Sequence, residues 1–344
     1  MSPRTPISPP ELESLLRQYP IPLRPNARLT PLPGGTINTN YRLDTADGPL
    51  LLRVNEGKTE GEVRFEAALI WHLGSRGFPT PQLWRTRRGE PLVWLPGREG
   101  RPDKAVMLMQ WAEGVELVEA DIDEVAAREA GLALARLHLC TADFPLRREG
   151  SYTLAHIRRR IDRLHHEPRI PDGIVEHLAR EAERLLMARR GGLPAGVGHN
   201  DLFPDNVLFS CRRRRRLVWV LDLEQAAVLP YVYDLAVALL SFCAAPGTTD
   251  ERIGPLRRAL ARALLAGYGT LRPLSDDERE ALYEELRFAA LRFTVTRLTD
   301  VYLGAAWPPG EERPHDKDYR QFLGRLTALE EIDTACLRQA LFDQ

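Results

Sequence analysis

The pattern of hydrophobic and polar positions changes once along the chain, near residue 113. Before this point, short apolar runs alternate with turn residues, which is typical of β-strands. Two stretches have a helical period instead, a short one after Ser8 and a longer one after Lys58. The predicted strands cover residues 28–32, 41–45, 50–55, 83–86, 92–95 and 105–111, and the predicted helices cover residues 8–19 and 60–75. These elements predict an antiparallel sheet accompanied by one long helix.

After residue 113, apolar positions recur mainly with the 3.6-residue period of buried or half-buried helices. The exceptions are two short apolar runs, at residues 207–209 and 217–221, which are predicted to form a hairpin. The predicted helices cover residues 124–139, 154–166, 173–189, 250–267, 275–302 and 318–341. We therefore expect an α+β protein with two lobes, residues 1–112 and residues 113–344, the second mainly helical.

Composition and charge narrow the possible partners. The 344 residues carry a net charge of -1, and 44% are hydrophobic, which is ordinary for a globular protein. We expect no nucleic-acid partner and no membrane partner, because the charge is balanced and no apolar run is long enough to span a bilayer. A cytoplasmic protein, monomeric or homodimeric, is the expectation. The four cysteines are far apart, which argues against a disulfide framework or a zinc site.

Two clusters of arginines stand out against this balance. One is the run at residues 212–216, which like-charge repulsion predicts to be a solvent loop. The other lies on the predicted helix 154–166 and consists of Arg158, Arg159, Arg160 and Arg163. A solvated helix face is the favoured interpretation of this second cluster. Contact with a phosphate or a carboxylate is the alternative.

The candidate chemistry centres on residues 199–209. Asp201 and Asn206 are separated by four residues, and the following apolar run ends at Asp222. Kinase-like phosphotransferases use this arrangement to align a hydroxyl group, Mg²⁺ and ATP. Asp201 would face the hydroxyl, while Asn206 and Asp222 supply the oxygen ligands that Mg²⁺ prefers. A turn that contains these residues by chance is the alternative, but the ordered series of motifs argues against it.

The first lobe offers candidate contacts for the nucleotide. The loop with Gly34, Gly35, Thr36 and Asn38 lies between two predicted strands, where glycines let backbone N–H groups approach phosphate oxygens. A simple turn is the alternative for this loop. Gln110 and Ala112 flank the end of the last strand, so their backbone is predicted to face adenine. An ordinary core strand is the alternative there.

Arg53, in the third predicted strand, is the candidate cation for the α- and β-phosphates. Lysine is usual at such a position, but the planar guanidinium of arginine binds phosphate through two hydrogen bonds and stays charged. Glu66, on the predicted helix 60–75, is its expected partner. Glu62, one turn earlier, is the rival candidate, and a solvated helix face is the alternative for both.

Three strings of residues carry a family resemblance. Residues 199–209, the Leu-Asp-Leu-Glu ending at Glu224, and Tyr-Asp-Leu-Ala at residues 233–236 resemble the aminoglycoside phosphotransferase and choline kinase superfamily. Within it, the chain is most similar to the bacterial homoserine kinases. The resemblance implies a bilobal, protein-kinase-like fold, with a nucleotide-binding N-terminal lobe and a C-terminal lobe that holds the catalytic loop and the acceptor. It also implies the cofactors ATP and Mg²⁺.

The resemblance also implies individual roles. Asp201 would be the catalytic base, and His199 would anchor the loop. Asp234 would cap its helix and brace the catalytic segment. The implied reaction converts L-homoserine to O-phosphohomoserine. The alternatives are another hydroxyl acceptor, such as an aminoglycoside, a choline-like amino alcohol or a sugar, and a nucleotide-binding module without activity.

Homoserine is a zwitterion, so its pocket needs a cation for the carboxylate and an acid for the ammonium group. The predicted helix 275–302 offers Arg292 and Arg297 for the carboxylate, and Glu224 is the candidate for the ammonium group. Ordinary ion pairing is the alternative for each arginine.

Overall fold

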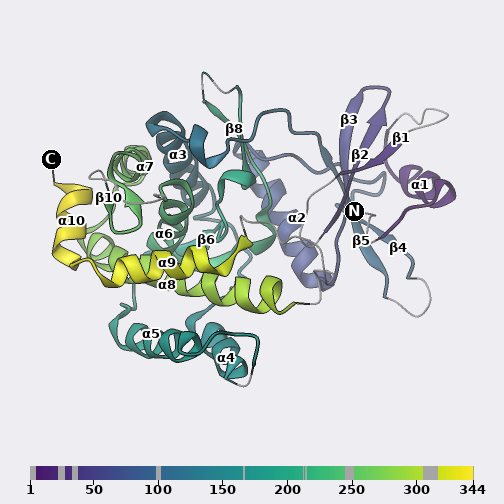
Figure 1. Cartoon of the computed structure of the whole chain (residues 1–344). Helices are drawn as coiled ribbons and strands as arrows, with labels where there is room; N and C mark the ends of the chain where they lie inside the picture. Colours follow the sequence, from purple (N-terminus) through teal and green to yellow (C-terminus); the bar gives the residue numbers. More distant parts are fainter. Residues whose placement is uncertain are drawn as a thin grey trace. The chain divides into compact units, whose positions relative to one another are not determined.

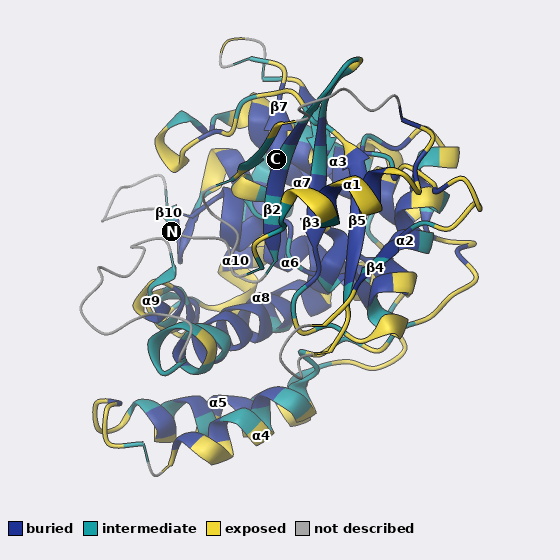
Figure 2. Cartoon of the chain, turned by 90° about the vertical axis from the view of Figure 1, so that its right-hand side faces the viewer, coloured by how far each residue is buried: buried dark blue, intermediate teal, exposed yellow. Residues whose placement is uncertain are grey.

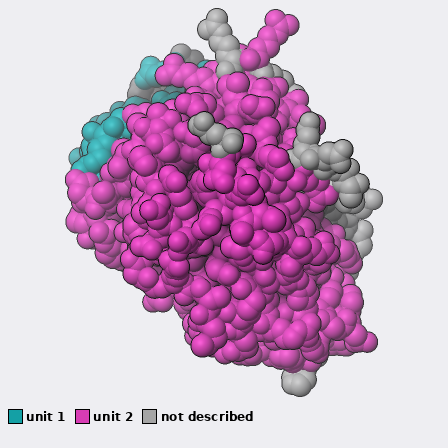
Figure 3. Space-filling view, turned by 90° about the vertical axis from the view of Figure 1, so that its left-hand side faces the viewer, with its two compact units in different colours: residues 1–114, 218–224 teal, residues 115–217, 225–344 magenta. Residues whose placement is uncertain are grey.

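The computed structural model describes residues 5–21, 28–32, 38–97, 102–165, 167–211, 213, 215–244, 252–304 and 317–343. The chain divides into two compact units, which Figure 3 colours separately. Unit 1 consists of residues 1–114 and 218–224, and unit 2 of residues 115–217 and 225–344. The short segment with Asp222 and Glu224 therefore groups with the N-terminal sheet, whereas the pattern of the sequence placed it in the second lobe.

Unit 1 is built on an antiparallel sheet of five strands in the order β1-β2-β3-β5-β4 (Figure 1). A two-residue turn before Gly48, whose φ is +118°, joins β2 to β3. One face of the sheet packs against helix α1 (Pro9–Leu16), which buries Leu12, Leu15 and Leu16. The strands are β1 (Arg28–Pro31), β2 (Thr39–Thr45), β3 (Gly48–Val54), β4 (Val93–Leu95) and β5 (Lys104–Gln110).

Helix α2 (Glu60–Ser75) has the bounds that its sequence pattern predicts. Thr59 and Glu62 form a capping box that satisfies backbone N–H groups at its start. Leu73 is fully buried, whereas Trp71 is 47% exposed, so Leu73 lies on the inward-facing side of the helix. Because Glu62 is used in the cap, Glu66 is left as the acidic residue of the buried face.

The predicted hairpin of residues 83–86 and 92–95 is wrong in its first arm. Only β4 forms a strand, while Leu83 makes an isolated antiparallel bridge to Met109 in β5. The Trp84 N–H donates to the Leu108 carbonyl at 2.8 Å, so this segment lies along β5 instead. Pro91, at the start of the second arm, has no N–H to donate, and the two arms bond across the turn, where the Thr86 N–H donates to the Glu90 carbonyl at 2.8 Å.

Unit 2 is mainly helical, as predicted. Helix α6 is buried along its whole length and is dark blue in Figure 2. It packs on α8, which packs in turn on α9, and α3 packs on α7. The helices are α3 (Glu124–Cys140), α4 (Leu154–Leu164), α5 (Ile174–Ala188), α6 (Tyr231–Phe242), α7 (Arg258–Leu271), α8 (Asp276–Thr296), α9 (Tyr319–Glu330) and α10 (Thr334–Phe342).

Helices α3 and α7 approach each other closely through a reciprocal pair of glycines. A Cβ atom at Gly131 would lie 2.0 Å from the Leu264 carbonyl oxygen, and one at Gly267 would lie 2.0 Å from the Arg128 carbonyl oxygen. Any side chain at either position would force the backbones apart, so both glycines are needed for this packing.

Three helix predictions in unit 2 need correction. The predicted helix 250–267 begins only at Arg258, because β10 (Arg252–Ile253) and β11 (Leu256–Arg257) form a tight hairpin before it. The predicted helix 275–302 continues past α8 as a π-helical segment, η4 (Arg297–Tyr302). The predicted helix 318–341 is broken between α9 and α10, where Asp333 caps the second helix.

Short strands and turns carry the segment around Asp201, which the sequence predicts to be catalytic. The strands are β6 (Ala195–Gly198) and β9 (Ala227–Pro230), which pair antiparallel, and β7 (Val207–Phe209) and β8 (Leu217–Val220). The 3-10 turns are η1 (Glu119–Asp121), η2 (Pro204–Asn206) and η3 (Leu223–Gln225).

Within the described part of the chain, no helix combines the length and the apolar character that crossing a bilayer requires.

Candidate functional site

The loop that follows β6 is held by a single buried carboxylate, that of Asp234 in α6. One oxygen of Asp234 accepts the backbone N–H of His199 and the other accepts that of Asn200, both at 2.7 Å. Asp234 therefore braces the catalytic segment, as predicted. The predicted helix cap is wrong, because α6 begins after Pro230 and Asp234 lies inside its first turn.

His138 of α3 completes this brace. Its Nε2 atom lies 2.9 Å from Asp234, and its Nδ1 atom lies 2.8 Å from the Tyr268 hydroxyl. Burial acts to raise the pKa of Asp234, but the hydrogen bond and charge of His138 outweigh it and hold the pKa below its ordinary value. Burial lowers the pKa of His138. The sequence analysis missed His138, whose one signal is a polar residue on the apolar face of a helix.

The loop then turns sharply toward Asp201. Asn200 has a φ of +67°, a left-handed conformation that asparagine tolerates better than most residues. The Asn206 side chain closes the turn, because its Nδ2 atom donates to the Asp201 carbonyl at 2.8 Å. Ser241 of α6 donates to the Leu202 carbonyl at 2.8 Å. The backbone around Asp201 is thus fixed on both sides, while the Asp201 side chain stays 31% exposed.

Arg292 of α8 also belongs to the loop support. Its Nη1 atom donates to the Asn200 carbonyl at 2.7 Å, and its Nη2 atom lies 3.8 Å from the Asp201 carboxylate. The guanidinium lies 4.3 Å from the centre of the Tyr152 ring and 3.9 Å from that of Phe293. Arg292 is 2% exposed, so it is placed to hold the loop and the Asp201 carboxylate.

Arg297 has different partners. Its Nη1 atom donates to the Asp318 carbonyl and to the Gln321 side chain, at 3.2 and 3.0 Å. Its guanidinium lies 4.5 Å from the centre of the Phe322 ring. These contacts tie the π-helical segment to the start of α9, so the structure gives Arg297 a packing role.

In unit 1, Arg53 of β3 pairs with Glu66 of α2, as predicted. Their closest atoms are 2.5 Å apart, and both side chains are buried. Burial acts to lower the pKa of Arg53, but the charges of Glu66 and Asp222 outweigh it and raise the pKa. The pKa of Glu66 is lowered, because Arg53 and Lys58 outweigh the opposing effect of burial. Both groups are therefore charged at neutral pH.

Asp222 and Glu224 extend this ion pair into a network. Asp222 has a φ of +54°, and its carboxylate lies 3.9 Å from Arg53 with 41% of the side chain exposed. Glu224 is buried, and it accepts hydrogen bonds from Lys58 Nζ and Asn38 Nδ2, both at 2.7 Å. Lys58 also lies 3.5 Å from Glu66. Glu224, predicted to meet the acceptor's ammonium group, is thus already bonded to a lysine that the sequence analysis did not single out.

The structure describes only some of the other residues that are predicted to contact the nucleotide. Gly34, Gly35 and Thr36 lie outside the described residues. Asn38 links the Glu56 backbone N–H, at 3.2 Å, to the Glu224 carboxylate.

Gln110 is the last residue of β5, and Ala112 follows the strand. The Gln110 N–H donates to the Gln82 carbonyl at 2.8 Å, so an adenine contact from Gln110 would rest on its carbonyl.

Within the described part of the chain, no cluster of three or more His, Cys, Asp or Glu side chains has the arrangement of a metal site. A magnesium ion needs few protein ligands, because water and phosphate oxygens complete its coordination. Asn206 and Asp222 are both oxygen donors, and bonding of Asn206 through Nδ2 leaves its carbonyl oxygen for a cation. The donor set therefore fits Mg²⁺.

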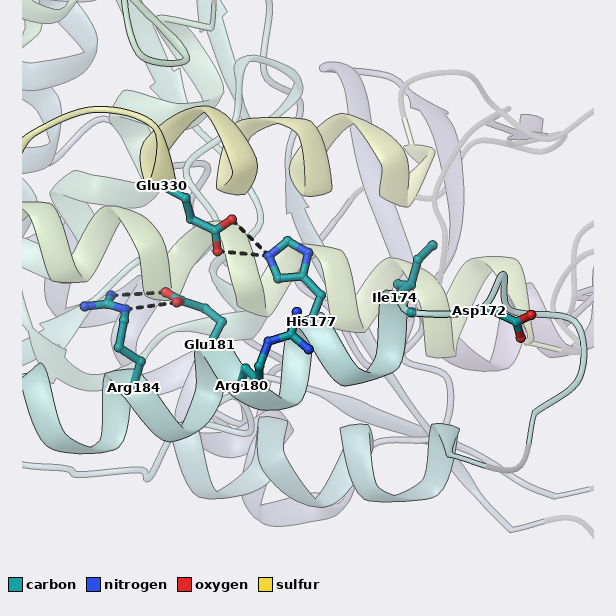
Figure 4. A pocket seen from close by; sticks show the side chains of 8 residues that line it. Asp172, Ile174, His177, Arg180, Glu181, Arg184 and Glu330 are labelled. Atoms are coloured by element: carbon teal, nitrogen blue, oxygen red, sulfur yellow. Dashed lines mark hydrogen bonds and ion pairs between the residues drawn. The ribbon is translucent and has the colours of Figure 1, made fainter.

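A hollow of about 640 Å³ lies beside α5 and α9 in unit 2 (Figure 4). Four of its charged side chains form two pairs. Arg184 lies 2.9 Å from Glu181, and His177 lies 2.9 Å from Glu330. Because Arg287 of α8 also bonds Glu181 and Glu330, this network joins three helices, and we interpret it as structural.

Comparison with known proteins identifies the family of the chain. The chain matches the phosphotransferase enzyme family over residues 28–274. It is 33% identical to the homoserine kinase of Xanthobacter autotrophicus, over 96% of this chain and 97% of the relative. It is 35% identical to the homoserine kinase of Nitrobacter hamburgensis, over 77% of each.

Solved structures share the fold at lower identity. An amicoumacin kinase in complex with AMP-PNP, Ca²⁺ and amicoumacin has a TM-score of 0.69 and 16% identity, over 94% of this chain and 93% of that chain. A spectinomycin phosphotransferase in complex with ADP and spectinomycin has a TM-score of 0.61 and 13% identity, over 98% and 99%.

The match to the family and the kinase-like fold define a small-molecule kinase, an enzyme that transfers phosphate to a hydroxyl group. The chain belongs to the phosphotransferase enzyme family.

Proposed function

We propose that this chain is an ATP- and Mg²⁺-dependent kinase that phosphorylates the hydroxyl group of L-homoserine. The observation that carries the proposal is the likeness to homoserine kinases over almost the whole length of both chains. The solved structures, at 13–16% identity, support the fold alone.

Unit 1 would hold the nucleotide. Arg53 is the proposed contact for the α- and β-phosphates, with Glu66 fixing its guanidinium. The Nε atom of Arg53 is buried and has no hydrogen-bond partner among the described residues, and a phosphate oxygen would satisfy it. The Gly34, Gly35 and Thr36 backbone is proposed to cover the phosphates. The Gln110 carbonyl and the Ala112 backbone are the proposed adenine contacts.

Asn206 and Asp222 are the proposed ligands of Mg²⁺. When bound, this ion neutralises the charge that develops on the phosphate oxygens and holds them in place. Asn206 contributes a neutral oxygen, and its Nδ2 bond to the loop backbone fixes the direction of that oxygen.

Asp201 is the proposed base. Its carboxylate accepts the proton of the homoserine hydroxyl while the hydroxyl oxygen forms a bond to the γ-phosphorus, and the bond from that phosphorus to the β,γ-bridging oxygen breaks. ADP leaves, and the phosphate ester is O-phosphohomoserine. The protein's contribution is positioning, because the fixed backbone on both sides of Asp201 holds the carboxylate at one place.

The test is an ADP-release assay of the purified chain with ATP and Mg²⁺ against four acceptors: L-homoserine, 3-aminopropan-1-ol, choline and an aminoglycoside. We expect the highest kcat/KM for L-homoserine, with O-phosphohomoserine identified by phosphorus NMR. A higher kcat/KM for any other acceptor overturns the homoserine assignment. If no acceptor is phosphorylated, the alternative of a nucleotide-binding module without activity takes the place of the kinase assignment.

A further inference from the structure

A second hollow of unit 2, about 340 Å³ in volume, lies between residues 149–151 and helix α4. We call it the α4 pocket. Its basic side chains fall at spacings of three and four residues on a single face of the helix, and the neighbouring Ile157 and Ile161 are buried. The lining residues are Glu149, Gly150, Ser151, His156, Arg159, Arg160 and Arg163.

The α4 pocket adjoins the catalytic loop at its 149–151 side. Glu149 makes a parallel bridge with Val228 of β9, and the Val228 N–H donates to the Arg148 carbonyl. A Cβ atom at Gly150 would lie 3.8 Å from the Asn200 side-chain nitrogen. Any side chain at residue 150 would therefore approach Asn200, the residue that precedes Asp201.

A second connection runs through Tyr152. Its ring centre lies 5.5 Å from the Arg160 guanidinium and 4.3 Å from that of Arg292. Arg292 in turn lies 3.8 Å from the Asp201 carboxylate. One aromatic ring thus separates a pocket arginine from the arginine beside the proposed base.

The arginines of α4 do not all have protein partners. Arg158 pairs with Glu183 of α5, and Arg160 bonds Thr299 and Asp300 of the π-helical segment. Arg159 and Arg163 make no ion pair with any residue that the structure describes. Among the described residues, Arg159 and Arg163 of the pocket therefore carry positive charge that no ion pair balances, and the pocket also holds one carboxylate, Glu149.

A zwitterion needs this combination of charges. The residues that the sequence predicts to bind the zwitterion have partners within the protein. Glu224 bonds Lys58, and Arg297 bonds the start of α9. Arg292 is buried and holds the Asn200 carbonyl. The α4 pocket offers both signs of charge, from its arginines and from Glu149.

We propose that the α4 pocket binds the amino-acid end of the acceptor, with Arg159 and Arg160 on its carboxylate and Glu149 on its ammonium group. This assignment rests on the proposed homoserine kinase function and identifies the residues that select an α-amino acid over an amino alcohol. The solvated-face interpretation of the arginine cluster then no longer applies to Arg159 and Arg160, whereas Arg158 pairs with Glu183 of α5.

The primary variant is R159Q, because Arg160 also anchors the π-helical segment. Loss of a charge-assisted hydrogen bond should raise the KM for L-homoserine about 10- to 100-fold and leave the KM for ATP unchanged. R159K should recover part of the loss, since a point charge still attracts the carboxylate. R158Q, on the same helix, is the matched control and should behave as the wild type.

Two truncated analogues separate the two charges. 4-Hydroxybutyrate lacks the ammonium group and 3-aminopropan-1-ol lacks the carboxylate, and both are measured as inhibitors of homoserine phosphorylation. R159Q should weaken inhibition by 4-hydroxybutyrate only, and E149Q should weaken inhibition by 3-aminopropan-1-ol only.

The outcomes distinguish this assignment from the proposed function. A wild-type chain that does not phosphorylate L-homoserine overturns the proposed function, and the assignment with it. A wild-type chain that does so, with an R159Q variant whose homoserine KM matches that of R158Q, overturns the α4 pocket alone. An equal rise of KM for homoserine and ATP in R159Q also counts against it, because it indicates a general structural effect.

Discussion

The two units hold their candidate functional groups in different ways. In unit 1, the charged groups are held by ion pairs. Arg53 pairs with Glu66 and lies 3.9 Å from Asp222, and Lys58 pairs with Glu66 and Glu224. In unit 2, the catalytic loop is held through its backbone. Asp234 accepts two loop N–H groups and Arg292 donates to a loop carbonyl.

This difference matches what each group must do. Ion pairs can change partners when a charged ligand binds. In a network of two cations and three carboxylates, the cations can bind phosphate and the carboxylates can bind a metal ion. Backbone hydrogen bonds do not depend on the ligand, and they keep the loop in place while the Asp201 side chain stays exposed. We infer that the ion pairs of unit 1 rearrange when the ligand binds, whereas unit 2 supplies a base whose loop is held in place.

The largest expected effect is on turnover, and it tests whether unit 2 positions a base. D201N keeps the shape of the side chain but removes its ability to accept a proton. We expect kcat to fall roughly 100- to 10,000-fold with little change in the KM for ATP. D205N is the matched control, because Asp205 is exposed on the same loop, and it should keep wild-type turnover. Near-normal turnover of D201N would show that Asp201 is not the base.

The next effect is on stability, and it tests the backbone brace. D234A leaves two buried N–H groups and the His138 imidazole without their acceptor. We expect the free energy of unfolding to fall by about 3–5 kcal/mol in urea titrations. E183A removes a carboxylate that is 62% exposed and should change it by less than about 1 kcal/mol. If D234A loses activity while its stability matches E183A, then Asp234 acts on the substrate and does not brace the loop.

A smaller effect should appear in the charge network of unit 1. K58M leaves the buried Glu224 carboxylate without its cation, so we expect a destabilisation of about 1–3 kcal/mol and a raised KM for ATP. Adding E224Q to the same chain should recover part of both losses, because the neutral amide no longer needs a partner. The double-mutant cycle should give a coupling of about 1 kcal/mol. Additive effects would mean that the two residues do not support each other.

The smallest effect is a pH dependence that belongs to unit 2. Burial lowers the pKa of His138 in the folded chain, so the unfolded chain takes up this proton first, near pH 6.5. The corresponding stability is fully present above that pH and is lost as the pH falls below it. H138Q lacks this dependence. The difference in unfolding free energy between wild type and H138Q should therefore narrow by at most about 1.4 kcal/mol per pH unit on acidification. A constant difference from pH 7 to pH 5 would contradict the lowered pKa.

The sequence by itself determined the elements whose signals are local. Thr59 and Glu62 mark the start of α2, and its apolar period identifies the buried face that carries Glu66. The sequence placed Arg53 on a strand and Glu66 on the next helix and predicted their pairing with Glu62 as a rival, and the structure shows Glu66 to be the partner. The spacing of Asp201 and Asn206 lies within one loop, and that loop closes through their own hydrogen bond. Signals of this kind act over a few residues, so they can be read without the fold.

Only the tertiary structure decided which distant charges are buried together. Lys58 and Glu224 are 166 residues apart in the sequence, and no periodic pattern links them. The same holds for His138 with Asp234, and for the α4 arginines with the catalytic loop through Tyr152. Hydrophobic periodicity specifies which face of an element is buried but not which other element covers it. Long-range partners are selected by packing and by the high cost of an unpaired buried charge, and both become defined only when the chain is folded.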